Sequence, residues 1–323
     1  MTTATEPPFV VKCPEDLIAF VPVALGFEPR DSVVLLTFGG GRPFHARLDL
    51  PPPNGVDRCV AQLLRPARRH RVARAALLIY TDDHRRARRV GRAARQAFQT
   101  ARITLIDVLR VDAGCWFTPL RGGGVDQGVP YDVSAHPFRA RAVLLGKVTL
   151  GSREELVASL APDVAGGARV AAATAEVEPL DAGAVERLVS GWLERRSTPD
   201  DREVAALLLG LTDDQVMLAA CGRMGAVHVA ESDAEADAAR ARVDFWRAVV
   251  RRAPRWLVAE PAAVLAFVAW LAGDGALAWC AVDRSRECDS HPLADLVAGL
   301  LEEAVPPEAW RGGLGAMPED AAG

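Results

Sequence analysis

The chain has 323 residues, half of them hydrophobic and a quarter charged, which excludes a disordered chain and is typical of a folded protein with room for two domains. The formal net charge is only −4, but it is unevenly distributed. Residues 1–150 carry 22 Lys and Arg against 13 Asp and Glu, whereas residues 151–323 carry 16 against 29. This asymmetry predicts either an anionic partner for the first half or attraction between the two halves.

The first predicted helix covers residues 14–25. Proline suits a first helical turn, Gly26 suits the left-handed position after a helix, and Pro29 prevents the helix from continuing. The apolar run over 33–38 is typical of an interior strand, and the alternating pattern over 44–50 is typical of a strand with one buried face. The glycines between these two strands predict an antiparallel hairpin.

Strands and helices then alternate along the chain, which predicts parallel pairing with right-handed crossovers. The alternating elements are a helix ending near residue 70, a strand over 75–80, a helix over 84–100 and a strand over 103–111. The elements that follow are a short strand at 115–117, a glycine-rich loop at 122–128, and helices at 135–146 and 153–161. We therefore predict an arginine-rich α/β domain over residues 1–162, built on a mixed sheet with parallel βαβ units and an N-terminal antiparallel hairpin.

The second half reads as helical almost throughout. Residues 163–180 are rich in Ala, Val and Gly with little periodicity, and they are predicted as a linker. Beyond it we expect an acidic, all-helical domain over 181–312 and a disordered tail over 313–323. The predicted helices are 182–196, 201–210, 213–222, 233–253, 261–272, 275–288 and 292–304. The pair over 261–288 is similar to a single tetratricopeptide unit, and one copy leaves open whether this half is a repeat scaffold.

Cysteine usage and hydropathy indicate the compartment. The six cysteines are far apart, and no CxxC occurs, so we expect reduced thiols in a reducing environment. Residues 1–8 lack the basic and apolar segments of a signal peptide. The most apolar run, 261–272, is shorter than the roughly 20 residues that a membrane helix needs. The sequence therefore predicts a cytoplasmic protein with no membrane association.

A ten-residue segment, Leu25-Gly26-Phe27-Glu28-Pro29-Arg30-Asp31-Ser32-Val33-Val34, resembles the signature of an uncharacterised, mainly actinobacterial family called domain of unknown function 4192. Further matches follow in order: Tyr80-Thr81-Asp82, Arg110-Val111-Asp112, Trp116, Tyr131, and Trp270-Leu271-Ala272-Gly273-Asp274-Gly275. One departure is Cys13, where the family more often has a small hydroxyl residue, so the first helix lacks its usual cap at a cost of about 1 kcal/mol. The resemblance implies no activity.

Polar residues follow two neighbouring strands of the predicted sheet. Ligands of α/β sheets usually bind beyond the carboxyl ends of parallel strands, so this edge is a candidate site for a small anionic ligand, phosphorylated or nucleotide-like. Tyr131, one of the positions that match the family, is included in the set. The candidate ligand-binding residues are Asp82, Asp83, His84, Arg110, Asp112 and Tyr131. The favoured interpretation is structural: Asp82 or Asp83 caps the following helix, and Asp112 begins a turn.

Thirteen arginines lie between Arg58 and Arg102, against two acidic residues. On the predicted helix over 84–100 they form a candidate anion-binding stripe of Arg85, Arg88, Arg92 and Arg95. Such a stripe could grip phosphates, but no aromatic residues are interleaved for base stacking. A solvated face, or a docking face for the acidic half of the chain, is the favoured interpretation, and nucleic-acid binding is the less favoured one.

No motif indicates a cofactor or a catalytic residue. The glycine patterns of dinucleotide and P-loop sites, the GxSxG and HExxH motifs, and paired histidines with metal-ligand spacing do not occur. We therefore expect no cofactor, no metal and no catalytic residue, and we predict a non-enzymatic regulatory or adaptor protein with a protein partner. Two alternatives stay open: an enzyme or sensor for a small anionic ligand at the strand ends, and nucleic-acid binding through the stripe.

Overall fold

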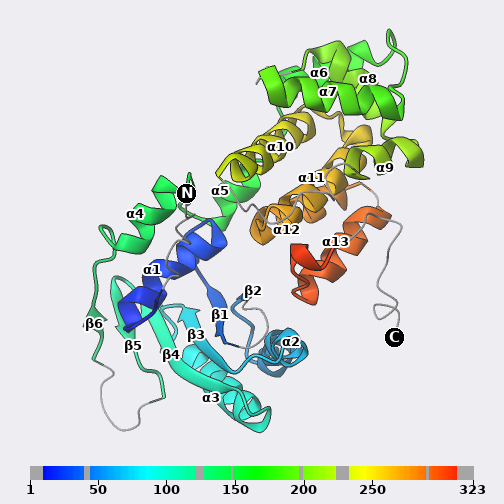
Figure 1. Cartoon of the computed structure of the whole chain (residues 1–323). Helices are drawn as coiled ribbons and strands as arrows, with labels where there is room; N and C mark the ends of the chain where they lie inside the picture. The colour runs from blue at the N-terminus through cyan, green and yellow to red at the C-terminus, as the bar shows by residue number, and fades with distance from the viewer. Residues whose placement is uncertain are drawn as a thin grey trace, which may run out of the picture. The chain divides into compact units, whose positions relative to one another are not determined.

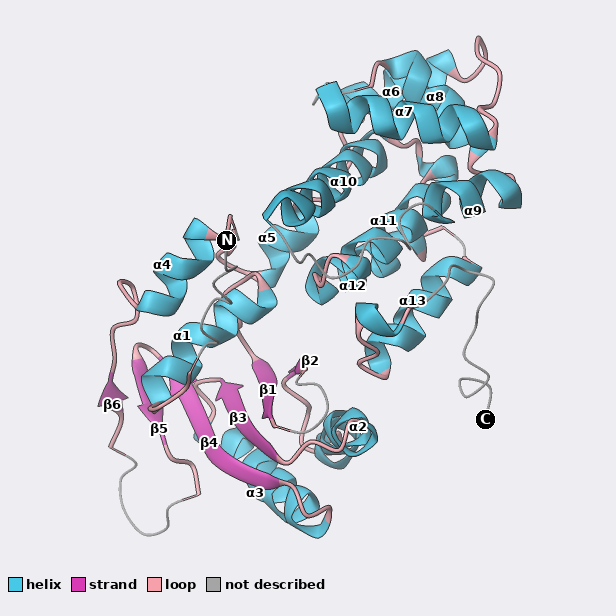
Figure 2. Cartoon of the chain, viewed as in Figure 1, coloured by secondary structure: helices cyan, strands magenta, loops and turns pink. Residues whose placement is uncertain are grey.

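The structure is a computed structural model that describes residues 10–39, 44–120, 127–146, 148–195, 199–222, 233–288 and 291–310. The chain divides into two compact units, Met1–Arg153 and Glu154–Gly323. Figures 1 and 2 show that the strands lie in the first unit and that the second unit is built from helices. The predicted tail and most of the predicted glycine-rich loop lie outside the described residues.

The first unit is built on a six-stranded sheet with the order β2-β1-β3-β4-β5-β6. Strands β3 and β4 are parallel, and the other neighbours are antiparallel, which confirms the predicted mixed sheet and its N-terminal hairpin. The strands are β1 (Ser32–Phe38), β2 (His45–Asp49), β3 (Arg74–Tyr80), β4 (Thr104–Asp112), β5 (Cys115–Phe117) and β6 (Val129–Pro130). The helices are α1 (Pro14–Leu25), α2 (Val56–Arg69), α3 (His84–Thr100) and α4 (Pro137–Leu144).

One pairing differs from the alternation rule. The order strand, helix, strand predicted that β2 and β3 would pair in parallel, but β1 lies between them and is antiparallel to both. The reason is the composition of β1, whose residues Val33, Val34, Leu35 and Leu36 are all fully buried. A strand that is apolar on both faces gains most at an interior position of the sheet. Direct parallel pairing is confirmed only between β3 and β4.

Helices α2 and α3 cover one face of the sheet. Their apolar stripes pack on inward-facing residues of β1, β3 and β4, and α3 contributes Ala87, Val90, Ala94 and Phe98, all fully buried. Gly91 lets α3 approach β4 closely, because a Cβ atom at this position would lie 3.1 Å from Cγ1 of Val108. Arg85, Arg92 and Arg95 of α3 are consequently exposed, whereas Arg86 is half-buried and donates to the carbonyls of Leu50 and Pro51.

Helices α1 and α4 lie next to one another, with α1 against the opposite sheet face (Figure 1). Phe20 of α1 contacts the ring of His45 on β2 and the ring of Phe138 on α4. Gly26 ends α1 with φ of 76° and donates its N–H to the carbonyl of Pro22 at 2.8 Å, which confirms the predicted helix stop. The next residue, Phe27, is buried and forms a parallel β-bridge with Leu150, which lies near the C-terminal end of the unit.

The second unit is made of helices around the buried helix α11, which is apolar on nearly every side. The helices are α5 (Arg153–Ala158), α6 (Val164–Ala173), α7 (Ala182–Arg195), α8 (Asp201–Gly210), α9 (Asp214–Gly222), α10 (Asp233–Arg252), α11 (Ala259–Leu271), α12 (Gly275–Ser285) and α13 (Pro292–Glu302). Two short 3-10 helices, η1 (Arg255–Leu257) and η2 (Pro307–Ala309), complete the unit.

Helix α6 occupies part of the segment that composition predicted as a linker. Asp163 caps this helix by accepting the N–H of Gly166 at 2.9 Å, and Val170 is fully buried. Gly166 lies close to α10, because a Cβ atom at this position would be 3.2 Å from Cγ of Arg252. Glycine is common both in linkers and at close helix contacts, so composition alone did not distinguish this helix from a linker.

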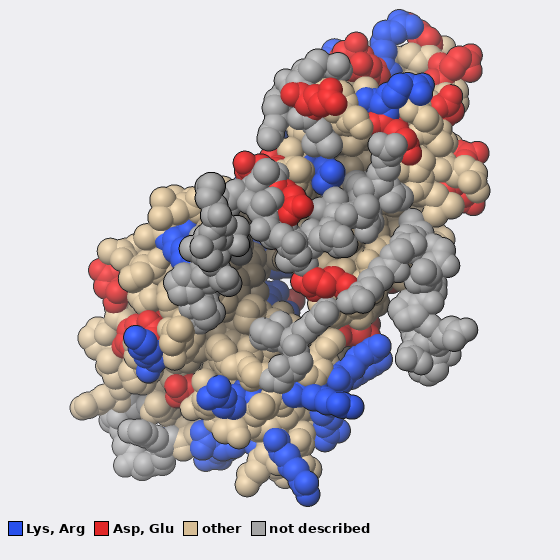
Figure 3. All heavy atoms as spheres, viewed as in Figure 1, with Lys and Arg blue, Asp and Glu red and all other residues tan. Residues whose placement is uncertain are grey.

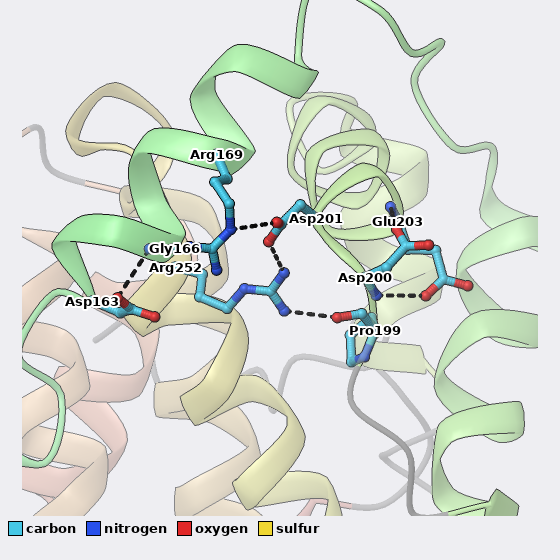
Figure 4. Close-up of polar contacts among 8 residues, drawn as sticks. All are labelled: Asp163, Gly166, Arg169, Pro199, Asp200, Asp201, Glu203 and Arg252. Atoms are coloured by element: carbon cyan, nitrogen blue, oxygen red, sulfur yellow. Dashed lines mark hydrogen bonds and ion pairs between the residues drawn. The ribbon is translucent and has the colours of Figure 1, made fainter.

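Asp201 holds three helices of the second unit together (Figure 4). Its carboxylate accepts hydrogen bonds from Nε of Arg169 on α6, at 2.7 Å, and from Arg252 on α10. Arg252 also donates to the carbonyl of Pro199 at 2.7 Å. Asp200 and Glu203 form a capping box at the start of α8, with bonds of 2.8 and 2.9 Å. We call Asp201, Arg169 and Arg252 the three-helix network.

Within the described ranges, no single helix has both the length and the apolarity to cross a bilayer. Helices α8 and α9 meet that criterion only as a pair, with a bend of 113° between them. Helix α11, the most apolar run of the sequence, is buried inside the second unit.

Candidate functional site

The residues that follow β3 begin helix α3. The carboxylate of Asp83 accepts the backbone N–H groups of Arg85 and Arg86, both at 2.9 Å, and therefore caps the helix. Asp82 and His84, on either side of it, are exposed. The helix cap that the sequence left open as an alternative is thus formed by Asp83.

Arg110 is buried at the end of β4, with 6% of its surface exposed. Its Nη1 donates to the carbonyl of Thr81 and to Oδ2 of Asp112, both at 3.2 Å. The guanidinium lies over the ring of Phe117, 3.5 Å from the ring centroid. These contacts fix Arg110 between two strands and one aromatic ring, while its Nε is buried with no acceptor among the described residues.

The candidate residues at the strand ends divide between the two faces of the sheet. Tyr80 pairs with Val111 in the parallel ladder, whereas Ile79 pairs with Arg110. Because successive side chains point to opposite faces, Arg110 lies on the α3 face and Tyr80 on the α1 face. Tyr131 interacts electrostatically with Tyr80. The structure therefore groups Tyr131 with Tyr80, a residue that was not among the candidates.

Tyr80 lies at the centre of a group that we call the tyrosine cluster: Tyr80, Tyr131, Glu28 and Arg139. Tyr80 is 8% exposed, and its hydroxyl has no hydrogen-bond partner among the described residues. Burial raises the pKa of Tyr80 well above its ordinary value, with further contributions from Tyr131 and Glu28 and opposition from Arg139. Tyr131 is half-buried, and burial also raises its pKa. These are the only two tyrosines of the chain.

Glu28 and Arg139 supply the charged part of the tyrosine cluster. Nη2 of Arg139, on α4, donates to Oε1 of Glu28 at 2.5 Å. The backbone N–H of Glu28 is bonded to the carbonyl of Leu150 at 3.0 Å, which fixes the segment after α1. Nε of Arg139 is buried, and no acceptor from the described residues reaches it. The cluster thus joins four separate chain segments and contains two buried groups, the Tyr80 hydroxyl and Nε of Arg139, that no acceptor from the described residues reaches.

Two further polar pairs connect α1 to the sheet and to α4. Nε2 of His136 donates to Oδ1 of Asp16 at 3.0 Å, and its Nδ1 accepts the N–H of Phe138 at 3.2 Å. Nε1 of Trp116 donates to Oε1 of Glu15 at 2.9 Å. The Trp116 bond lowers the pKa of Glu15. Burial alone would raise the pKa of Asp16, but bonds from two backbone N–H groups and from His136 hold it below its ordinary value.

Asp16 also explains how α1 begins without a hydroxyl cap. Its Oδ2 accepts the backbone N–H groups of Lys12 at 2.6 Å and of Cys13 at 3.2 Å. This is the reverse half of a capping box, in which the third residue of the helix binds back to the start. The missing hydroxyl at Cys13 is therefore partly compensated from inside the helix.

Sequence reasoning missed Tyr80, Glu28 and Arg139 as members of one site. A signal was present, because both tyrosines of the chain and Glu28 belong to segments that match the family. Arg139 carried no signal, since it is one of 36 arginines among 38 basic residues and comes from a different helix. Only the tertiary fold brings α4 against the segment after α1.

The arginine stripe lies on α3 as the helical period predicted. Arg85, Arg92 and Arg95 are exposed, and Arg88 is half-buried. Figure 3 shows Lys and Arg side chains gathered over α2 and α3 of the first unit. Arg95 acts on Asp107 of β4, whose pKa is raised by burial and partly lowered again by this arginine.

The part of the chain that the structure describes contains neither a cluster of metal ligands nor paired cysteines. There, no group of three or more His, Cys, Asp or Glu side chains could hold a metal ion. The six cysteines are free thiols.

Residues 14–308 match the family described as Domain of unknown function (DUF4192), and the chain therefore belongs to that family. Neither the curated proteins nor the solved structures give a match to this chain. The match begins at the first residue of α1 and includes every residue of the tyrosine cluster.

Proposed function

We propose that this protein is a non-enzymatic regulatory protein that binds a small anionic ligand at the tyrosine cluster. The observation that carries the proposal is the Tyr80 hydroxyl, which is buried without a partner among the described residues. A buried, unpaired hydroxyl destabilises a fold by about 1–3 kcal/mol, and phenylalanine would avoid that cost at the same position. A ligand atom that accepts from Tyr80 would recover it.

Three features favour an anionic ligand over a cationic one. Both groups of the cluster without a partner among the described residues can donate: Nε–H of Arg139 is a donor only, and the hydroxyl of Tyr80 can donate as well as accept. The chain segment that forms the first unit has more basic than acidic residues, 22 against 13 over residues 1–150, which attracts anions over distance. The cluster also lies where β3 ends, the usual position of phosphate-bearing ligands in α/β sheets.

Three carboxylates of the first unit already have hydrogen-bond partners, which supports binding rather than catalysis. Glu28 is paired with Arg139, Asp16 with His136, and Glu15 with Trp116. Glu15 and Asp16 have lowered pKa values and stay ionised at neutral pH, so neither is suited to donate a proton as a general acid. We further propose a cytoplasmic location, because six free cysteines fit a reducing compartment.

Fluorine NMR tests the proposal directly. Protein grown with 3-fluorotyrosine gives two ¹⁹F signals, both from the cluster, because the chain has two tyrosines. We expect phosphate, nucleotides or phosphorylated metabolites to move both signals saturably at physiological salt. Tyr80→Phe removes one signal, assigns the other and weakens binding about tenfold, since one charge-assisted hydrogen bond is lost.

Arg139→Gln should weaken binding at least as much as Tyr80→Phe. The matched control is Arg85→Gln, an exposed arginine of the same unit on α3, which should leave both ¹⁹F signals and the affinity unchanged. If no anion in the panel moves either signal, or if binding survives Tyr80→Phe and Arg139→Gln unchanged, the cluster is not a ligand site.

A further inference from the structure

The second unit contains an open pocket of about 550 Å³, which is within the range of roughly 300–1,000 Å³ typical of ligand sites. It is formed by η1, the first turn of α11, the residues after α12, and the N-cap of α13. The lining residues are Arg255, Trp256, Ala259, Glu260, Glu287, Cys288 and His291. All of them belong to the helical unit, so the pocket is independent of the tyrosine cluster.

Hydrogen bonds between the wall segments hold the pocket open. Oγ of Ser285 donates to the carbonyl of Ala259 at 2.8 Å, which ties the end of α12 to the start of α11. Sγ of Cys288 lies 3.0 Å from the carbonyl of Arg255 and donates to it. Nδ1 of His291 accepts the N–H of Leu293 at 3.2 Å and caps α13. The thiol and one ring nitrogen are therefore used for structure, and the walls are fixed before any ligand arrives.

Glu260 is the polar group of the pocket that the fold leaves unused. Its Oε2 is buried, and no donor from the described residues reaches it. The neighbouring His291 is a neutral imidazole, because burial lowers its pKa, although Glu260 partly opposes this shift. A neutral ring does not balance the charge of a carboxylate. Glu287, the other acid of the lining, is bonded to Arg284. Glu260 therefore contributes to the lining a carboxylate whose buried Oε2 is reached by no donor from the described residues.

Trp256 adds an aromatic surface at the mouth of the pocket, with 67% of its area exposed. Tryptophan is the aromatic side chain that binds cations best through its ring face. The second half of the chain carries 29 acidic against 16 basic residues, so its field also attracts cations. Arg255 is the one cationic residue of the lining. It is exposed, and its backbone carbonyl accepts the hydrogen bond from Cys288.

We propose that this pocket binds the guanidinium group of an arginine on a partner polypeptide, stacked on Trp256 and paired with the carboxylate of Glu260. Guanidinium combines the properties that the pocket requires, since it is planar, permanently charged and able to donate several N–H groups to one carboxylate. Lysine offers a point charge without a stacking plane, so it fits the same pocket less well.

Calorimetric titration of the full chain with capped tripeptides tests this proposal. The three peptides are Gly-Arg-Gly, Gly-Lys-Gly and Gly-citrulline-Gly, in which citrulline is an uncharged isostere of arginine. We expect the arginine peptide to bind in the millimolar range or better, and the citrulline peptide at least about tenfold more weakly, because it lacks the charge that Glu260 recognises. Free arginine separates binding of the amino acid itself from binding of a polypeptide side chain: it should bind more weakly than the capped peptide.

Two variants locate the binding. Glu260→Gln keeps the shape of the side chain and should weaken arginine-peptide binding about tenfold, whereas Trp256→Ala, at an exposed position, should weaken it about threefold. Glu302→Gln, an exposed acid at the end of α13 outside the pocket, is the matched control and should change nothing. Equal binding of the arginine and citrulline peptides, or full binding by both pocket variants, would overturn the proposal, as would tighter binding of a nucleobase than of the peptide.

Discussion

The three-helix network and the tyrosine cluster are both groups of polar side chains between helices, yet they use their hydrogen bonds differently. In the network, both oxygens of Asp201 accept from arginines, and Arg252 makes an additional bond to a backbone carbonyl. In the cluster, the Tyr80 hydroxyl and Nε of Arg139 remain without acceptors among the described residues. The network uses its hydrogen bonds within the fold, whereas the cluster keeps the two unpaired groups on which the proposed ligand site rests.

The largest effect is expected from Asp201→Ala. This change leaves Arg169 and the largely buried Arg252 without their shared acceptor and should lower the free energy of unfolding by about 2 kcal/mol. Urea denaturation followed by circular dichroism measures it. The control is Asp237→Ala, which breaks an exposed pair within α10 and should cost less than about 0.5 kcal/mol. Equal effects of the two substitutions would show that the network contributes no more than a surface pair.

Acid should weaken the same network. Hydrogen bonds from Arg169 and Arg252 lower the pKa of Asp201 in the folded protein, so its stabilising contribution is complete above the ordinary aspartate pKa of about 4. That contribution is lost as the pH falls through the lowered value. Unfolding midpoints measured from pH 6 to pH 2 should therefore converge between the native protein and Asp201→Ala. A constant difference across that range would contradict the assignment.

Tyr80→Phe should act in the opposite direction. Because the hydroxyl is buried and unpaired, its removal should raise the free energy of unfolding by about 1 kcal/mol while it weakens ligand binding. Thermal unfolding without added ligand measures the gain. Destabilisation by Tyr80→Phe would mean that the hydroxyl already has a partner in the free protein.

The smallest effect is expected from the arginine stripe. Changing Arg85, Arg88, Arg92 and Arg95 to Gln should shift stability by less than about 0.5 kcal/mol, because these side chains lie on the solvent side of α3. Gel-shift assays at low salt should show no nucleic-acid binding by the native protein. Binding that weakens steeply with salt and disappears in the variant would instead assign the stripe to phosphate contacts.

Local signals in the sequence predicted most of the fold. The period of α3, the stop at Gly26 and the short strand β5 were each readable from a few neighbouring residues. The position of β1 between β2 and β3 was not, because strand order depends on which strand gains most from burial on both faces. Helix α6 was hidden by its glycines, whose role is visible only beside Arg252.

The candidate site was predicted only in part. The sequence set of candidates included Tyr131 only through the family resemblance, and it could not distinguish the two faces of the sheet. It also gave no reason to select Arg139, whose importance comes from its bond to Glu28, 111 positions away in the chain. A contact between residues so far apart in the chain cannot be recognised in a single sequence unless a charge pattern or a spacing motif marks the residues.

The bridge between Phe27 and Leu150 has a consequence for synthesis on the ribosome. Glu28 leaves the ribosome early, but the backbone bond that fixes it comes from Leu150, one of the last residues of its unit. At roughly 5–20 residues per second, this interval lasts on the order of ten seconds. During that time the first unit is incomplete and the apolar faces of β1 are not fully covered. A nascent chain arrested before Leu150 should therefore bind chaperones and should lack a formed tyrosine cluster.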